Sequence, residues 1–513
     1  MADTVREIER KYEAGDGTGP AHLPDLSGAA PVAAAHDRGT AELDAVYYDT
    51  ADRRLAAAGI TLRRRTGGTD AGWHLKLPVA PGVRDEIRAP LAAAVPRALT
   101  ALVRSRTRDA PLRPLVRIVS RRQVHHLHDA GGTLLAEAGT DTVTATALTD
   151  GGATARWTEV EIELARGGDE DLFDALEPHL RKAGLRPSDA PSKLARALAE
   201  TGIAPLTEPP ATSLPPKPTA GDHVLAYLRE QAEAVLTLDP GARLGTEDAV
   251  HQMRVATRRL RSAFRTYAGV LDRRVTDPLA AELKWLAAEL GIDRDREVVT
   301  ERLREHLDEL PRTLVRGPVR ARLRIWSSRN RIESRKRLTS VLDGKRYLAL
   351  LDSLDALLAD PPLRTAAAKP PAPALAKAVL RDYARLAARV EHALATAAPG
   401  PERDTALHDA RKAAKRTRYA AEAATAGLGK PAKRFAKQLK TVQSLLGDHQ
   451  DSLMARGALR TIAAQADGAG ESAFTFGLLY GREEQRAEQA ERELPEVWAA
   501  VSDKRWREGL EAQ

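Results

Sequence analysis

Acidic side chains recur at every second position in two segments of the sequence. Residues 7–11 read Glu-Ile-Glu-Arg-Lys, and residues 159–163 read Glu-Val-Glu-Ile-Glu. Because side chains at i and i+2 of a β-strand project from the same face, each segment would crowd carboxylates on one face. Such like charges repel one another unless solvent or a divalent cation separates them, and carboxylate oxygens suit Mg²⁺ or Mn²⁺. The spacing therefore indicates either a metal site or a solvated sheet face.

Basic side chains follow the same two-residue spacing in further segments. Arg63 and Arg65 would share one strand face, and Lys76 would lie opposite the apolar residues of the segment 73–77. A polar face backed by an apolar face on nearly every strand describes a barrel whose lumen is wet and charged. A lumen that carries both acids and bases suits a metal-bound oligophosphate. The repetition over several strands disfavours the alternative of ordinary solvated sheet faces.

Two segments of the C-terminal part each contain a histidine followed by bases at +3, +7 and +10. The first series is His251, Arg254, Arg258 and Arg261, and the second is His408, Arg411, Lys415 and Arg418. On a helix, each series forms a single stripe. Like charges stacked in this way destabilise a helix slightly, and a bound polyanion would offset that cost. A solvated basic face is the alternative, but the repeated spacing favours anion binding.

The composition of the 513-residue chain also points to an anionic partner. Its net charge is +8, whereas aromatic residues make up only 4%, which leaves few stacking platforms for single-stranded nucleic acid. The absence of cysteine excludes thiolate metal ligands. Residues 1–11 are charged, and no apolar run approaches the roughly 20 residues of a membrane span. We therefore expect a cytoplasmic protein without a signal peptide and without membrane contact.

The elements that must position these side chains fall into three parts. Residues 1–201 alternate in the manner of short strands, residues 202–220 are rich in proline, and residues 221–513 have helical spacing. We predict an α+β multidomain protein with a β part, an extended linker and an all-α part. The histidine motifs recur at positions 251 and 408, so the all-α part is predicted to be duplicated, over about 221–360 and 374–510.

Several motifs within about residues 1–200 follow one another in an order that resembles the CYTH domains, the triphosphate tunnel metalloenzymes. They are Glu-x-Glu-x-Lys at 7–11, the arginines at 63–65, Lys76, Arg84-Asp-Glu86, Arg121-Arg122, Glu-x-Glu-x-Glu at 159–163 and Ser192-Lys193. The resemblance implies an eight-stranded antiparallel barrel that forms a tunnel. It implies metal ligands at Glu7, Glu9, Glu161 and Glu163, with Asp141 matching a further acid of the family. It implies phosphate contacts at Lys11, Arg63, Arg65, Lys76, Arg84, Arg122 and Lys193. Ser120 and Thr140 depart from the family pattern, where a lysine and an acid are common.

The two histidine motifs and the segment Leu-Gly at 290–291 resemble the CHAD domain, the conserved-histidine α-helical domain, over about residues 221–510. The resemblance implies two four-helix bundles around a basic groove that binds inorganic polyphosphate. The implied polyphosphate contacts are His251, Arg254, Arg258, Arg261, His408, Arg411, Lys412, Lys415 and Arg418. In the second repeat Gln450 stands where the first has Arg294, so the two halves differ in charge.

These features favour a divalent-metal-dependent triphosphatase that acts on P–O–P bonds, with Glu7, Glu9 and Lys11 as catalytic residues and Mg²⁺ or Mn²⁺ as cofactor. The helical part would bind inorganic polyphosphate, including that of polyphosphate granules. A non-catalytic, granule-associated scaffold is the main alternative. An adenylate cyclase would need a nucleoside pocket, for which the sequence offers no motif. A nucleic-acid-binding protein is not expected, because the basic helices match no known DNA-binding motif.

Overall fold

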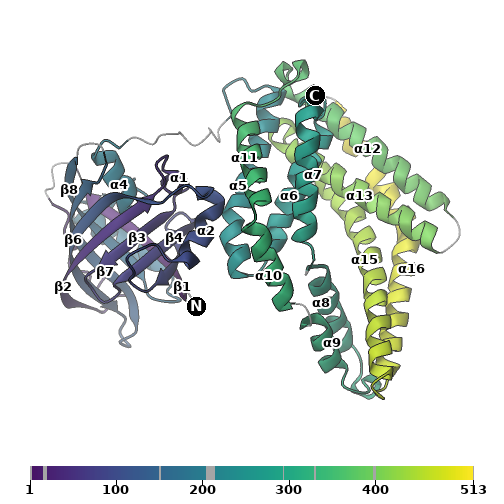
Figure 1. Ribbon diagram of the computed structural model, residues 1–513, viewed down its shortest axis with the longest axis horizontal. Coiled ribbons are helices and arrows are strands. Elements are labelled where there is room, and N and C mark those ends of the chain that lie inside the picture. The colour runs from purple at the N-terminus through teal and green to yellow at the C-terminus, as the bar shows by residue number, and fades with distance from the viewer. Residues whose placement is uncertain are drawn as a thin grey trace. The chain divides into compact units, whose positions relative to one another are not determined.

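The computed structural model describes residues 3–15, 20–149, 152–203, 214–292, 294–328, 331–396 and 400–511. The chain separates into two compact units, Met1–Pro210 and Ala211–Gln513 (Figure 1). Of the proline-rich linker predicted over 202–220, residues 204–213 lie outside the described residues. Among the helices within the described ranges, none combines the length and the apolar character that crossing a membrane requires.

The N-terminal unit is a closed antiparallel barrel of eight strands, as the sequence predicts. The strands are β1 (Asp3–Ala14), β2 (Ala34–Asp49), β3 (Thr61–Thr66), β4 (Gly72–Ala80), β5 (Val83–Ala89), β6 (Arg113–His128), β7 (Leu134–Ala147) and β8 (Thr154–Leu164). Their order is β5-β4-β3-β2-β6-β7-β8-β1, and a pairing between β5 and β1 closes the ring. The short strand β9 (Leu185–Pro187) pairs with the end of β1, beyond its pairing with β5.

Alternation along the strands separates an apolar outer face from a charged inner face. On β8, Val160 and Ile162 pack against the helix α3 (Asp171–Lys182) through Leu172 and Leu176. The carboxylates at positions 159, 161 and 163 lie on the opposite face of the same strand. Two further short helices, α1 (Arg54–Ala57) and α2 (Arg97–Thr107), connect strands of the barrel.

One end of the inner face is apolar and packs against the helix α4 (Lys193–Glu200). Leu194 and Ala197 of this helix share a core cluster with Tyr47 and Trp157 of the barrel. Ser192 caps the helix by accepting a hydrogen bond from the backbone N–H of Ala195 at 3.0 Å. The cap fixes the start of α4, so that Lys193 enters the lumen from the first turn of the helix.

The C-terminal unit is helical, as predicted. Its helices are α5 (Ala220–Leu244), α6 (Ala249–Thr266), α7 (Arg273–Glu289), α8 (Arg294–Asp308), α9 (Val319–Ser328), α10 (Arg331–Leu342), α11 (Lys345–Ala359), α12 (Pro371–Ala395), α13 (Pro401–Ala423), α14 (Thr425–Leu428), α15 (Lys430–Asp467), α16 (Phe474–Ser502) and α17 (Arg505–Glu511). Short 3₁₀ turns are η1 (Arg312–Leu314) and η2 (Thr365–Ala368). Thr219 and Asp222 form a capping box at the start of α5.

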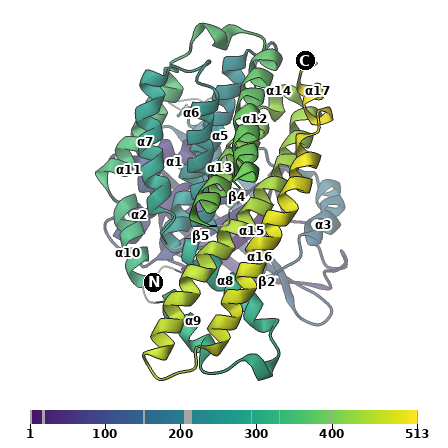
Figure 2. The ribbon, with the colours of Figure 1, turned by 90° about the vertical axis from the view of Figure 1, so that its right-hand side faces the viewer.

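Two apolar cores hold these helices together. The long helices α15 and α16 run side by side (Figure 2). The larger core draws side chains from both predicted repeats, including α5, α6 and α7 of the first and α12, α13 and α15 of the second. The smaller core joins α8 and α9 to the distal part of α15 and the beginning of α16. Helices α6 and α13, which carry the two histidine motifs, contact one another. The side chain of Arg294, the counterpart of Gln450, lies outside the described residues.

Candidate functional site

The register between neighbouring strands of the barrel places acidic and basic residues opposite one another on its inner face. Arg122 of β6 lies opposite Asp141 of β7, and Asp141 lies opposite Glu159 of β8. On the other side of β8, Glu161 lies opposite Lys11 of β1. Directly opposed residues in antiparallel strands have side chains within reach of each other. The register therefore builds a charged wall from four strands.

Three carboxylates of this wall converge on one point. One oxygen from each of Asp141, Glu159 and Glu161 lies within 4.8 Å of the others. Their exposed fractions are 0%, 3% and 7%, so the group is shielded from bulk water. The Trp157 indole N–H donates to Glu159 at 2.7 Å and holds its orientation. A buried set of oxygen donors fits Mg²⁺ or Mn²⁺, which are the ions that the sequence suggests.

Lysine side chains supply the positive charge that these carboxylates need. The Lys193 ammonium lies 2.9 Å from Asp141 and 2.7 Å from Glu159, and it also contacts Glu161. Lys11 pairs with Glu161 as well. Burial opposes ionisation of Lys193, but the neighbouring carboxylates raise its pKa above the ordinary lysine value. The Lys193 ammonium group therefore lies among the three carboxylates, which are arranged around its positive charge.

The other carboxylates proposed as metal ligands lie outside this cluster. Glu7 pairs with Lys76 at 2.5 Å, and Glu9 lies 3.3 Å from Lys11. Burial works against ionisation of Glu9, but the ammonium groups of Lys11 and Lys76 lower its pKa to about 2. Glu163 makes no hydrogen bond or ion pair within the described residues, and burial together with repulsion by Glu7 raises its pKa to about 7.

The arginines predicted to bind phosphate line the same lumen. Arg122 donates to Asp141 at 2.9 and 2.6 Å and pairs with Glu161. Arg84 donates to the carbonyl of Pro191. Burial and the neighbouring guanidinium groups of Arg63 and Arg122 lower the pKa of Arg65 to about 9. Guanidinium groups that crowd one another in this way are stabilised by an anion placed between them.

Two acids of the lumen were not among the site residues that the sequence singled out. Glu159 belongs to the metal-capable cluster, although it lies in the same alternating segment as Glu161. Glu86 is 1% exposed and lies 2.8 Å from His74 Nδ1 and 3.9 Å from both Arg63 and Lys76. The two-residue spacing had already placed Glu159 on one strand face with Glu161, and Glu86 belongs to the Arg84-Asp-Glu86 motif, but the resemblance gave neither acid a role.

The two basic stripes of the helical unit face one another. Among the predicted polyphosphate contacts, all are partly buried except Lys412, which is exposed and pairs with Asp409 at 3.2 Å. Burial and repulsion by Arg258 and Arg411 lower the pKa of Lys415 to about 7. Because Arg258 belongs to α6 and Lys415 to α13, charges from both repeats meet at one place.

Acids compensate this basic surface only in part. Arg411 lies 3.5 Å from Asp451, and Arg418 pairs with Glu422. Burial and repulsion by Arg265 and Arg258 lower the pKa of Arg261. The surface suits a long polyanion that contacts both stripes.

Comparison with known proteins follows the same division of the chain. A family model described as the CYTH domain matches residues 6–198, and a model described as the CHAD domain matches residues 226–460. Two uncharacterized proteins of Mycobacterium tuberculosis, MT2285 of strain CDC 1551 and Rv2226 of strain H37Rv, are each 40% identical over 503 residues. These alignments cover 95% of this chain and 94% of each relative.

Two solved structures show distant likeness to the chain. PptA from Streptomyces chartreusis is 23% identical with a TM-score of 0.46, and the match covers 55% of this chain and 99% of that one. The CHAD domain from the plant Ricinus communis is 23% identical with a TM-score of 0.43, and the match covers 59% and 94%.

Proposed function

Because this chain belongs to the family of proteins that join a CYTH domain to a CHAD domain, we propose that it is a divalent-metal-dependent triphosphatase that binds inorganic polyphosphate through its helical unit. The CYTH domain is the triphosphate tunnel, and the substrate is inorganic tripolyphosphate or a related triphosphate. The observation that carries the proposal is the convergence of Asp141, Glu159 and Glu161 beside Arg122 and Lys193.

Acids and bases of the lumen neutralise one another when no substrate is present. A metal-bound triphosphate offers both partners at once, because the metal suits the carboxylates and the phosphate oxygens suit the bases. When bound, Mg²⁺ or Mn²⁺ would neutralise phosphate oxygens and lower the pKa of a water molecule. The released Lys11, Arg122 and Lys193 then bind the phosphates, and with Arg63 and Arg65 they stabilise charge on the transferring phosphoryl group.

The helical unit contributes binding. Its facing stripes on α6 and α13 concentrate positive charge that acids compensate only in part. Long-chain polyphosphate is a flexible anion that can follow both stripes, and this binding would place the protein on polyphosphate granules. The competing function is polyphosphate binding at both units without hydrolysis. An assay of turnover distinguishes this function from a triphosphatase.

Phosphate release by the purified full chain tests the proposal. Tripolyphosphate, ATP and long-chain polyphosphate are each assayed with Mg²⁺, with Mn²⁺ and with EDTA. We expect metal-dependent release from tripolyphosphate, abolished by EDTA and reduced by about 100-fold or more in Glu161→Gln and Glu7→Gln, because each removes a lumen charge while keeping side-chain shape. The matched control is Glu42→Gln, an exposed carboxylate on the outer face of the same barrel. Unchanged turnover in both lumen variants, or no release under any condition, would contradict the proposal.

A further inference from the structure

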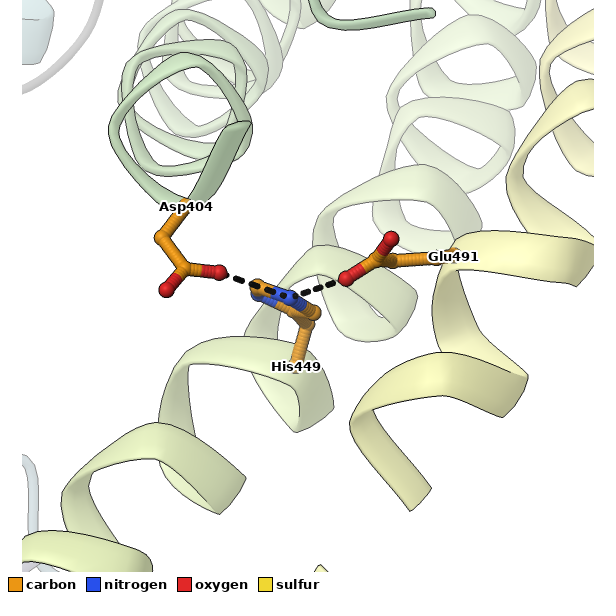
Figure 3. A group of neighbouring side chains, drawn as sticks. All are labelled: Asp404, His449 and Glu491. Carbon is orange, nitrogen blue, oxygen red and sulfur yellow. Dashed lines mark hydrogen bonds and ion pairs between the residues drawn. The ribbon is translucent and has the colours of Figure 1, made fainter. Parts of the chain in front are cut away.

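A second group of metal-capable side chains lies in the helical unit, apart from the tunnel. It consists of Asp404 on α13, His449 on α15 and Glu491 on α16, whose ligand atoms all lie within 4.8 Å of one another. Figure 3 shows the His449 ring between the two carboxylates, with each side chain coming from a different helix. His449 is 2% exposed, so its position is fixed by the surrounding helices.

The contacts of this group are poorly explained by hydrogen bonding alone. His449 Nε2 lies 3.2 Å from Glu491 Oε1 and 3.6 Å from Asp404 Oδ1. A single ring nitrogen carries at most one proton, which it can donate well to only one of two carboxylates. Within the described residues, the Asp404 carboxylate makes no other hydrogen bond or ion pair. The Asp404 carboxylate, whose side chain is 35% exposed, is thus left to solvent or to a cation for its further contacts.

The same separations match the edges of a metal coordination shell. Bonds of about 2.0–2.1 Å to nitrogen and oxygen at the tetrahedral angle place neighbouring ligand atoms roughly 3.3–3.4 Å apart. The separations of 3.2 and 3.6 Å from His449 Nε2 lie on either side of that value. Arg403 pairs with the other oxygen of Glu491 at 2.7 Å, which orients that carboxylate and leaves Oε1 directed at the imidazole.

We propose that Asp404, His449 and Glu491 form a site for a zinc-class divalent ion that joins α13, α15 and α16. One imidazole and two carboxylates suit Zn²⁺, whereas the oxygen-only cluster of the tunnel suits Mg²⁺ or Mn²⁺. Three protein ligands leave a further coordination position for water or another oxygen donor. The ion would tie together the helix that carries the second basic stripe and the two longest helices of the unit.

Zinc content of the full chain tests the site. The protein is stripped with EDTA, incubated with Zn²⁺ in excess Mg²⁺ to satisfy the tunnel, desalted and analysed by mass spectrometry of the metal. We expect one zinc equivalent per chain in the parent and a loss of Zn²⁺ affinity of roughly 100-fold or more in His449→Gln and Asp404→Asn, because each removes a direct ligand. The matched control is His392→Gln, which changes an exposed histidine of the same unit and is expected to keep the equivalent.

Substitution with Co²⁺ separates a metal role from a structural one. A four-coordinate site with an imidazole ligand gives intense visible absorption, which the oxygen-only tunnel site lacks. His449→Gln keeps a side-chain N–H for Glu491, so a purely structural histidine would leave folding and metal content as in the parent. Loss of the Co²⁺ absorption in a variant whose circular dichroism is unchanged supports the site. Equal zinc content in all variants, or no bound zinc in the parent, overturns it.

Discussion

Arginine and lysine side chains gather in both units, but their neighbours differ. In the tunnel, carboxylates surround Arg122 and Lys193 and raise their pKa values despite burial, although burial and the neighbouring arginines lower the pKa of Arg65. In the helical unit, burial and other bases lower the pKa of Lys415 and of Arg261. We therefore expect the tunnel to bind a ligand that carries its own cation and the helical surface to bind a polyanion that brings negative charge alone.

The largest expected effect is a loss of polyphosphate affinity when basic residues are removed from both stripes, on α6 and α13. Replacing Arg254, Arg258, Arg411 and Lys415 together with alanine should weaken long-chain polyphosphate binding by roughly three powers of ten, if each cation contributes at least about 1 kcal/mol. Each pair alone should weaken binding less, because the other stripe still holds the chain. Parent affinity should fall steeply as salt rises, since binding releases counterions. Fluorescence anisotropy of labelled polyphosphate measures both effects.

A matched control removes the same total charge from exposed positions of the same unit. The control residues are Arg273, Arg274, Arg304 and Arg320, each of which pairs with a nearby carboxylate. Alanine at these four positions should change polyphosphate affinity little. Equal losses in the two quadruple variants would show that net charge, and not the facing stripes, governs binding. Tripolyphosphate hydrolysis should survive in both.

A buried carboxylate holds the two stripe-bearing helices together, and its removal should destabilise the unit. Asp382 of α12 is 2% exposed, accepts a hydrogen bond from Thr266 of α6 at 2.5 Å and pairs with Arg416 of α13 at 2.7 Å. Asp382→Ala leaves the buried Thr266 hydroxyl and the partly buried Arg416 guanidinium without their acceptor, which costs about 1–3 kcal/mol. Urea unfolding measures the loss, and Asp352→Ala is the comparison at an exposed acid of α11. A change below about 1 kcal/mol would contradict this role.

The sequence was sufficient to predict the barrel, but it did not show which of the lumen carboxylates lie close together. Two-residue alternation placed Glu159 and Glu161 on one strand face, and the resemblance supplied Asp141 and the closed ring of eight strands. Which carboxylates converge depends on cross-strand register, such as the pairing of Asp141 with Glu159, and no single strand carries that information. Glu159 was therefore left out of the predicted metal ligands, while Glu7, Glu9 and Glu163 lie outside the cluster.

The sequence showed repeated motifs in the helical unit, but it did not show where helices end around those motifs. The Leu-Gly pair at 290–291 follows the end of α7, whereas the second Leu-Gly pair, at 446–447, lies inside the 38-residue helix α15. A glycine is compatible with either outcome, and packing against neighbouring helices decides between them. The distal part of α15 packs on α16, α8 and α9. The Asp404–His449–Glu491 group likewise depends on helix packing, here of α13 and α16 on α15, because its members come from three helices and share no sequence motif.

A smaller effect, in the pH dependence of binding, would test the charge excess directly. The pKa of Lys415 is about 7 because burial and the neighbouring arginines disfavour its ammonium form. A polyanion favours that form, so affinity should be full below pH 7. It should weaken by up to about tenfold per pH unit above pH 7, where binding requires proton uptake. Burial and Lys412 lower the His408 pKa from its ordinary value.

Lys415→Arg provides the control for the pH effect. A guanidinium remains charged throughout the accessible range, so the affinity of this variant should change little between pH 7 and pH 8.5. Internal phosphates of a long chain also stay ionised over this interval, which leaves Lys415 as the titrating group. The same slope in parent and variant would show that the proton is taken up elsewhere.

The smallest effect is expected when the helical unit is removed altogether. The tunnel residues that carry the proposed chemistry all lie within Met1–Pro210, which forms a compact unit with its own apolar clusters. A fragment of residues 1–204 should fold and hydrolyse tripolyphosphate within about threefold of the parent turnover, because a short substrate needs no contact with the stripes. It should lose the steep salt dependence of long-chain binding.

Circular dichroism checks folding, and phosphate release with Mg²⁺ or Mn²⁺ measures turnover. A folded but inactive fragment, beside an active parent, would mean that the helical unit takes part in catalysis and that the two kinds of basic surface act together.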